Sequence, residues 1–288
     1  ERNSRFVMDM HSCEVVPPQV SALLTPLRDF LATLSVVRRI PQIELAVGDE
    51  QTVLVLRHLE PLGADDLEKL RQFGQKHDVC WWLQPKGPDS AHPLEAGQDR
   101  LFYRLPEYGL TMHFKPTDFT QVNHAVNQVM IRRALSLLEL QPEHRVVDLF
   151  CGLGNFTLPL ATQVQSVVGV EGSETLVERA QELARAHGLQ GRAEFSVLDL
   201  FNIDERWLTS LGYFDRMLID PPRDGAVAVA KAISALPIAQ QPERIVYVSC
   251  NPATLARDAG ILVHVGGYRL QAAGVVNMFP HTAHIESM

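Results

Sequence analysis

From Val122 onwards the sequence alternates between amphipathic helical segments and short apolar segments rich in β-branched residues. Residues 122–140 have the spacing of a long amphipathic helix, and the apolar run 145–150 follows at once. Such alternation is typical of a parallel β-sheet with helices on both faces. Ligands of these sheets bind at the carboxyl ends of the strands. We therefore predict an α/β fold here and expect the functional residues at the strand ends. Further apolar runs lie at 167–171, 193–200, 214–219 and 244–250.

The first part of the chain has a different organisation, without a glycine-rich loop. Residues 42–60 predict a hairpin that turns at Gly48 and Asp49, and residues 101–116 predict another. Residues 65–79 predict an amphipathic helix that is followed by a strand over 80–85. A strand is also predicted over 5–16. The sequence therefore indicates two domains, an α+β domain over 1–117 and an α/β domain over 118–288.

Composition limits the classes of protein that remain. The chain has 288 residues and a net charge of −8, which argues against gripping nucleic acid through bulk charge. The acidic total charge is still compatible with a local basic groove, or with a basic module elsewhere in the protein. The four cysteines lie far apart without a CxxC pair, which favours reduced thiols and a cytoplasmic protein. No apolar run has the roughly 20 residues of a membrane span. The sequence begins at Glu1 and not at a methionine, so we expect a fragment, and we expect a monomer.

A nucleotide-type cofactor site is predicted at the first two strand ends. Gly152 and Gly154 follow the first strand and allow a tight turn with close approach of a ligand. Glu171 ends the second strand, where a carboxylate can accept both ribose hydroxyls, and Asp199 ends the third, where a side chain can meet an adenine edge. Thr157 stands where a dinucleotide fingerprint has its third glycine, which favours S-adenosylmethionine over NAD. A dinucleotide fold, or a glycine turn with an incidental acid, remains the alternative.

Two further strand ends carry groups suited to catalysis. Residues 220–223, Asp-Pro-Pro-Arg, end the fourth strand, and Cys250 ends the fifth. Asn251 and Pro252 have the residue types of an N-cap and a first helical position. A thiol beside a helix N-terminus faces partial positive charge, which predicts a favoured thiolate. The alternative is a half-buried structural cysteine.

The residue types favour attack at carbon. Methylation of an exocyclic amine calls for an aromatic residue after the two prolines, and Arg223 stands there instead. C5 of uracil takes a methyl group only after a thiolate such as Cys250 adds at C6, and a base must then remove the C5 proton. Glu286 is the candidate base. His281 and His284 lie close to Glu286 in sequence, but the spacing is not that of a zinc motif, and we expect them to line a polar pocket.

These motifs together resemble the RNA uridine-C5 methyltransferase family. The resemblance is dense over the second half and extends into the first half through DFTQVN (118–123). Within the family the chain most resembles the bacterial members that act on 23S ribosomal RNA and carry an iron–sulfur cluster. Transfer RNA is the alternative substrate. The resemblance implies a Rossmann-like class I S-adenosylmethionine-dependent methyltransferase domain preceded by a smaller α+β RNA-recognition domain. The motifs are DLFCGLGNFTLPLA (148–161), DPPR (220–223), VSCNPATLARD (248–258) and FPHTAHIESM (279–288).

The resemblance also implies residue roles. Cys250 would be the nucleophile, Glu286 the base, and Phe119 a neighbour of the target base. Cys13 occupies the place of the last 4Fe-4S ligand, whereas the three ligands and the basic RNA-binding module that precede it in the family are absent from this sequence. The family continues past the residue equivalent to Met288 as a final strand, so an incomplete sheet edge is expected. The implied S-adenosylmethionine contacts are Gln121, Phe150, Asn155, Glu171, Asp199 and Asp220.

Two alternatives of other kinds remain open. An amine methyltransferase would keep its activity without Cys250. A non-catalytic RNA-binding or assembly factor would fail to bind S-adenosylmethionine, although intact motifs at every strand end argue against it.

Overall fold

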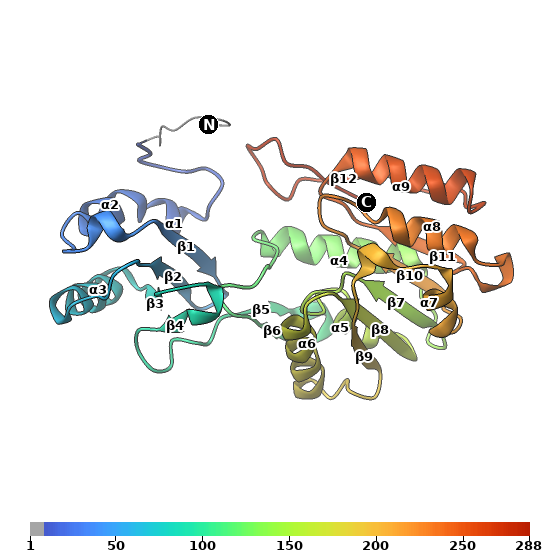
Figure 1. Ribbon diagram of the computed structural model, residues 1–288, viewed down its shortest axis with the longest axis horizontal. Coiled ribbons are helices and arrows are strands. Elements are labelled where there is room, and N and C mark those ends of the chain that lie inside the picture. The colour runs from blue at the N-terminus through green and yellow to red at the C-terminus, as the bar shows by residue number, and fades with distance from the viewer. Residues whose placement is uncertain (1–8) are drawn as a thin grey trace. The chain divides into compact units, whose positions relative to one another are not determined.

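The computed structural model describes residues 9–288, which divide into two compact units (Figure 1). The first unit contains the residues up to 103 together with 113–120 and 280–282. The second contains 104–112, 121–279 and 283–288. Part of the strand predicted over 5–16 lies outside the described residues. Its described part, residues 9–16, forms no strand. These residues are mostly exposed, so burial of apolar side chains does not hold them against a sheet.

The first unit contains a four-stranded sheet in the order β1-β2-β3-β4. β1 and β2 form the predicted antiparallel hairpin, and β3 pairs parallel to β2 after the predicted helix α3. Leu56 of β2, Leu70 of α3 and Trp81 of β3 are fully or almost fully buried in one core cluster, so the helix packs on the sheet. The elements are α1 (Pro18–Ser21), α2 (Leu24–Leu31), η1 (Val37–Arg39), β1 (Gln42–Val47), β2 (Thr52–Arg57), α3 (Ala64–His77), β3 (Cys80–Gln84), η2 (Pro88–Ser90) and β4 (His92–Pro93).

The second predicted hairpin is also present. β5 (Phe102–Leu105) and β6 (Leu110–His113) form a separate two-stranded sheet, and η3 (Pro106–Tyr108) joins them. Gly109 follows η3 with φ of 65°, a left-handed conformation that glycine adopts without a steric penalty.

The second unit is built on a five-stranded sheet in the order β11-β10-β7-β8-β9. All neighbouring strands are parallel, which confirms the α/β prediction. β7, β8 and β10 are buried over most of their length, as expected for strands covered on both faces of a sheet. The five strands are β7 (Arg145–Leu149), β8 (Ser166–Glu171), β9 (Ala193–Val197), β10 (Arg216–Ile219) and β11 (Arg244–Tyr247).

Helices cover both faces of this sheet. Val147, Leu149 and Ile219 belong to a buried cluster that includes residues of α7, α8 and α9. Alternate strand residues such as Val146 and Leu218 point to the opposite face, and α4, α5 and α6 also pack against the strands. The helices are α4 (His124–Leu138), α5 (Thr157–Ala161), α6 (Glu174–Ala186), η4 (Leu200–Asn202), α7 (Glu205–Ser210), α8 (Val227–Ala235), η5 (Ile238–Gln240) and α9 (Pro252–His264).

The last residues of the chain return to the end of β11. β12 (Val275–Val276) and β13 (Glu286–Ser287) pair antiparallel. Ser249 and Ser287 exchange two backbone hydrogen bonds, N–H to O, of 2.9 and 2.8 Å. The pairing therefore brings Glu286 beside the segment that carries Cys250. β11 is one of the two edge strands of the five-stranded sheet, and a groove of about 790 Å³ runs between it, α9 and residues 267–273.

Close packing around Gly169 in β8 predicts a large effect of one added methyl group. A Cβ there would lie 2.7 Å from Cδ1 of Phe195 and 2.9 Å from Sγ of Cys151. We expect Gly169→Ala to lower the free energy of unfolding by about 1–3 kcal/mol, as overpacking of a buried site does. Gly191→Ala is the matched control, because a Cβ there meets no atom within 4 Å. Urea denaturation followed by circular dichroism measures both; equal stabilities would contradict the packing.

Candidate active site at the strand ends

The predicted residues of the second unit meet at one edge of its sheet because the strands end in register. Leu149 pairs with Val170 on one side and with Ile219 on the other, and Ile219 pairs with Tyr247. The residues that follow these positions are therefore at one level of the sheet. This edge carries Phe150 after β7, Glu171 at the end of β8, Asp199 after β9, Asp220 after β10 and Cys250 after β11.

The loop after β7 has the tight backbone that its glycines predict. Phe150, Gly152 and Gly154 have φ of 64°, 54° and 87°, so the chain turns through left-handed conformations three times. Positive φ is uncommon for a phenylalanine and often marks a functional loop. Glu171 fixes this loop, since its carboxylate accepts hydrogen bonds from the N–H groups of Gly152 (3.1 Å) and Ser173 (3.0 Å). Each carboxylate oxygen still has lone pairs for a ligand.

Other proposed cofactor contacts have local partners. Asn155 and Asn127 of α4 exchange two amide hydrogen bonds of 2.9 and 3.0 Å, a pairing that the sequence did not indicate. Asp199 accepts from the N–H of Phe201 (3.0 Å) and from Nδ2 of Asn202 (2.6 Å), so it caps η4. Gln121 is different: its Oε1 is buried without a hydrogen-bond partner. An unpaired buried amide oxygen is costly and suits a ligand that donates to it.

Asp148 lies fully buried inside β7 and was not assigned a role from the sequence. Its Oδ2 accepts a hydrogen bond of 2.6 Å from Thr157 Oγ1, whereas its Oδ1 has no partner. Burial raises the pKa of Asp148 to about 7, although the hydrogen bond from Thr157 acts in the opposite direction. The usable signal in the sequence is an acid in the middle of an otherwise apolar strand.

Acidic groups also surround the thiol of Cys250. Glu286 is buried at 5% exposure, and burial raises its pKa, while Arg223 acts to lower it. Burial, together with the charges of Glu286 and Asp148, raises the pKa of Asp220 to about 8. A carboxylate with a raised pKa is a stronger base at neutral pH. The geometry therefore provides a thiol with a basic carboxylate beside it.

The predicted preference of Cys250 for the thiolate form is wrong for this structure. Cys250 does precede the N-cap Asn251, whose Oδ1 accepts from the N–H of Ala253 at 3.1 Å. Burial and the nearby Glu286 and Asp220 nevertheless raise the pKa of the thiol, and only Arg223 and a backbone hydrogen bond oppose them. The sequence showed that a helix begins just after Cys250. It could not show that the carboxyl groups of Glu286 and Asp220, which come from distant segments, lie near the thiol.

The metal prediction finds no support in geometry. Among residues 9–288, no three His, Cys, Asp or Glu side chains lie close enough to hold a metal ion. Cys13 is half-buried with a free thiol, and its backbone N–H donates to Oγ of Ser21. His284 Nδ1 lies 3.2 Å from Nη2 of Arg223, and His281 is exposed.

Phe119, predicted near the target base, belongs to the first unit and is 78% exposed.

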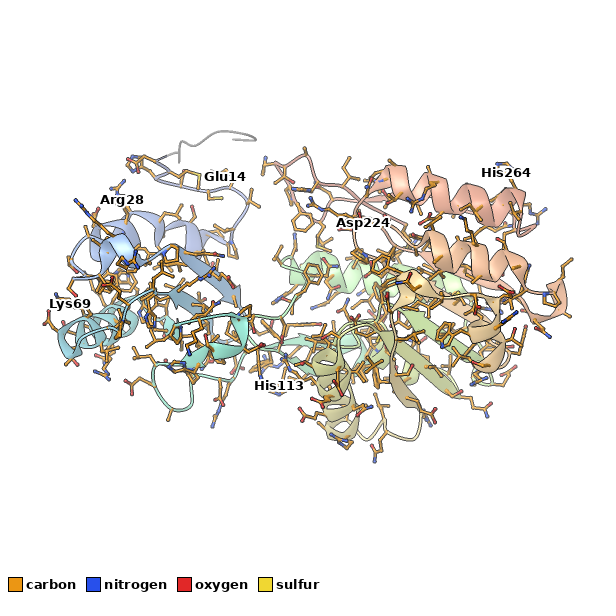
Figure 2. All side chains as sticks on the ribbon, viewed as in Figure 1. Glu14, Arg28, Lys69, His113, Asp224 and His264 are labelled. Atoms are coloured by element: carbon orange, nitrogen blue, oxygen red, sulfur yellow. The ribbon has the colours of Figure 1, made fainter. Side chains whose placement is uncertain are left out.

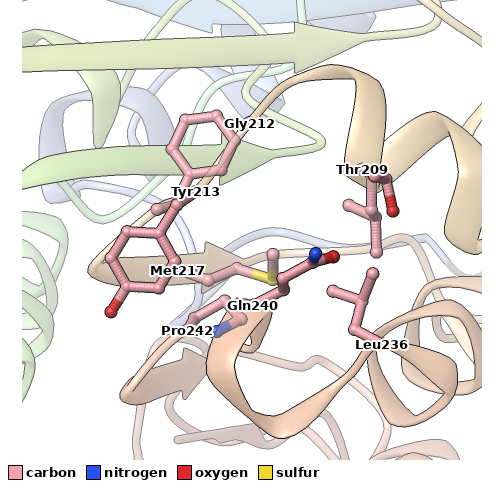
Figure 3. Close-up of a pocket in the computed structure, with 9 residues that line it drawn as sticks. Thr209, Gly212, Tyr213, Met217, Leu236, Gln240 and Pro242 are labelled. Atoms are coloured by element: carbon pink, nitrogen blue, oxygen red, sulfur yellow. The ribbon is translucent and has the colours of Figure 1, made fainter.

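A small pocket of about 210 Å³ lies elsewhere in the second unit (Figure 3). It is uncharged, and it includes Met217 near the start of β10 and Pro242 just before β11. It therefore opens at the amino ends of the strands, opposite to the edge that carries Asp220 and Cys250. Its lining residues are Leu208, Thr209, Gly212, Tyr213, Phe214, Met217, Leu236, Gln240 and Pro242.

Residues 57–288 match the family model described as tRNA (uracil-5-)-methyltransferase, and the chain belongs to this family. Similar curated proteins include the 23S rRNA (uracil(1939)-C(5))-methyltransferase RlmD of Bordetella avium, 63% identical over all of this chain and 61% of that protein. RlmD of Ralstonia pickettii is 57% identical over all of this chain and 65% of its own length. The chain thus spans about three fifths of these relatives.

Solved structures support the fold. The tRNA (uracil-54, C5)-methyltransferase of Pyrococcus abyssi, in complex with S-adenosyl-L-homocysteine, is 24% identical with a TM-score of 0.73, and covers 98% of this chain and 69% of its own. The tRNA m1G37 methyltransferase of M. jannaschii has a TM-score of 0.55 at 12% identity and covers 94% of this chain and 77% of its own. The Rossmann-like methyltransferase fold is therefore confirmed. Within residues 9–288 no helix has the length and apolar character needed to cross a membrane.

The raised pKa of Asp148 predicts a pH dependence of stability. Because the folded pKa (about 7) exceeds the unfolded value of 3.8, unfolding releases a proton between these values. The protonated carboxyl of Asp148 contributes about 2–4 kcal/mol to the free energy of unfolding. This contribution is complete below about pH 4 and is lost as the pH rises through about 7. Asp148→Asn should remove this slope. Urea unfolding at about pH 5, 7 and 9 compares parent and variant; parallel curves would show that Asp148 ionises normally.

Proposed function

We propose that this chain is the catalytic part of an S-adenosylmethionine-dependent RNA uracil-C5 methyltransferase that acts on 23S ribosomal RNA. The observation that carries the proposal is the backbone pairing of Ser249 with Ser287, which brings the segment of Cys250 beside that of the buried Glu286, at the edge where the cofactor loop also lies. Amine methylation needs no such pair of thiol and carboxyl. The RlmD names of relatives at 57–63% identity support the reaction and the substrate.

The residues at this edge fit S-adenosylmethionine. When bound, this cofactor supplies an electrophilic methyl group. Glu171 is held by two backbone donors and can accept the ribose hydroxyls, while the unpaired Oε1 of Gln121 is a ready acceptor. Asp220 and the Phe150 loop complete the set, and Asn155 and Asp199 border it in the proposed assignment. The described residues do not assemble a ligand set around Cys13, so we derive no step from an iron–sulfur cluster.

The protein residues would carry the proton and electron transfers on the uracil. The thiol of Cys250 releases its proton to solvent, and Sγ then forms a bond to C6. The electron pair of the C5–C6 double bond moves into an enolate, which makes C5 nucleophilic. After C5 has gained the methyl group, Glu286 removes the remaining C5 proton. The electron pair of that C–H bond restores the double bond, and the C6–Sγ bond breaks to return the thiolate. The raised pKa of Glu286 suits this role.

The RNA substrate has one specific rival. The matching family model and the Pyrococcus abyssi structure both carry transfer RNA names, whereas the curated relatives at high identity carry ribosomal RNA names. Identity over the whole chain favours 23S ribosomal RNA. Mass mapping of methylated nucleotides after incubation with each RNA separates the two. A ribosomal RNA substrate also favours a cytoplasmic location, and we keep the expectation of a monomer.

The mechanism predicts that substitutions of Cys250 and Glu286 fail differently. Cys250→Ala should abolish methylation because no enolate forms at C5. Glu286→Gln should still allow addition and methyl transfer but stall before elimination, so that protein accumulates covalently joined to methylated RNA. A denaturing gel with labelled RNA detects the adduct, and RNA with fluorine at C5 of the target uracil should trap the parent in the same way.

Cys80→Ala is the matched control for this experiment, since Cys80 is a free thiol in β3 of the first unit. It should keep both methylation and adduct formation. Methylation by Cys250→Ala would disprove nucleophilic catalysis and favour the amine methyltransferase alternative.

A further inference from the structure

The loop that follows β10, residues 220–226, is bound along its backbone by side chains of α9 and its N-cap. Nδ2 of Asn251 donates to the carbonyl of Arg223 (3.0 Å), and Oγ1 of Thr254 donates to the same oxygen (3.3 Å). Nη2 of Arg257 donates to the carbonyl of Asp224 (2.8 Å). Figure 2 labels Asp224 in this loop and His264 at the far end of α9. The loop is therefore attached to the helix that begins two residues after Cys250.

Asp258 is the centre of this attachment. It is fully buried, and its Oδ2 accepts from the N–H of Ala226 and from the hydroxyl of Tyr247, both at 2.7 Å. Its Oδ1 accepts from Nε of Arg257 at 2.7 Å. One carboxylate thus joins the loop, β11 and α9. A buried charge with three donors is held in one place, because moving it would leave it unpaired.

The loop approaches α9 more closely than a side chain would allow. Gly225 has φ of 75°, and a Cβ on it would lie 2.6 Å from Nη2 of Arg257 and from Oδ2 of Asp258. It would also lie 2.9 Å from Cβ of Thr254. The glycine therefore permits the short contacts that Asp258 and Arg257 make.

We propose that Asp258 is a positioning residue, which fixes Arg223 of the 220–226 loop relative to Cys250 and so places a positive charge at the reacting thiol. This rests on the proposed function, in which Cys250 is the nucleophile. Asn251 follows Cys250 directly and bonds to Arg223 itself, so a shift of the loop moves Arg223 with respect to the thiol. The charged groups that act on Cys250 are Asp220 and Arg223 from the loop and Glu286 from β13.

A positioning role of Asp258 predicts that its loss moves Arg223 but not Asp220. Asp220 is held at the end of β10 by the hydrogen bond of its N–H to the carbonyl of Leu149 (3.2 Å), so it stays with the sheet. Arg223 lies further along the loop: its carbonyl is held by Asn251 and Thr254, and Nη2 of its side chain lies 3.2 Å from Nδ1 of His284. Loss of Asp258 should therefore withdraw the positive charge and leave the acidic groups in place. Of the charged groups acting on Cys250, Arg223 is the one that favours the thiolate.

The test measures the alkylation rate of Cys250 by iodoacetamide against pH, with the modified peptide identified by mass spectrometry. Arg223→Gln should raise the titration midpoint and slow alkylation near neutral pH by about three- to tenfold, since one pKa unit is a factor of ten. Asp258→Asn should produce a shift of the same sign. In the double variant, Asp258→Asn should add nothing to Arg223→Gln, because it acts through that residue.

Asp66→Asn is the matched control. Asp66 is a buried carboxylate of the first unit that accepts from the N–H and hydroxyl of Ser35, so the substitution removes a comparable buried anchor. It should destabilise the chain and leave the Cys250 profile unchanged. Arg257→Leu is a second variant, which removes the contacts of Arg257 with Asp224 and Asp258 but keeps the bonds of Ala226 and Tyr247 to Asp258. It should shift the profile in the direction of Asp258→Asn.

An unchanged Cys250 profile in a folded Asp258→Asn or Arg257→Leu protein would overturn the proposal. An Asp258→Asn shift of undiminished size in the Arg223→Gln background would overturn it as well. Alkylation needs neither RNA nor S-adenosylmethionine. If Cys250→Ala keeps methylation while the parent shows the predicted profiles, the proposed function fails and the positioning role of Asp258 stands.

Discussion

Two backbone hydrogen bonds between Ser249 and Ser287 join segments that are remote in sequence. One of these residues precedes Cys250, and the other follows Glu286, so the pairing determines that a thiol and a carboxyl face the same edge. Because Glu286 is buried there, its charged form is disfavoured and its pKa rises. The same carboxyl raises the pKa of Cys250 in turn. Both properties disappear if the chain end is released.

The electrostatics of the strand ends also point to the kind of ligand that fits. Asp148 and Asp220 have pKa values raised to about 7 and 8, and Glu286 is shifted in the same direction. Three carboxyl groups that resist ionisation in the free protein would ionise more readily near a cation. A sulfonium ion is such a cation, so on the proposed function we expect cofactor binding to release protons. Arg223 is the opposing charge and lies in the loop fixed by α9.

Much of this arrangement follows from local sequence patterns. The alternation after Val122 predicted the parallel sheet, and the glycines after β7 predicted its tight loop. The ionisation of Cys250 could not be predicted, since its pKa depends on burial and on the charges of Glu286 and Asp220, which come from other segments. The Asn127–Asn155 pair and the contacts of Asp258 likewise join separate elements. Asp148 was visible as an acid within an apolar strand, although its partner Thr157 was read only as a missing glycine.

The most direct measurement of the central claim is the ionisation of Cys250 with and without the Glu286 charge. Glu286→Gln keeps the shape of the side chain and removes its negative charge, so the midpoint of the Cys250 alkylation profile should fall and alkylation near neutral pH should become faster. Glu143→Gln, an exposed glutamate of the second unit, provides the control and should leave the profile unchanged. If Glu286→Gln leaves the midpoint where it is in the parent, the carboxyl does not lie against the thiol and the proposed active site is wrong.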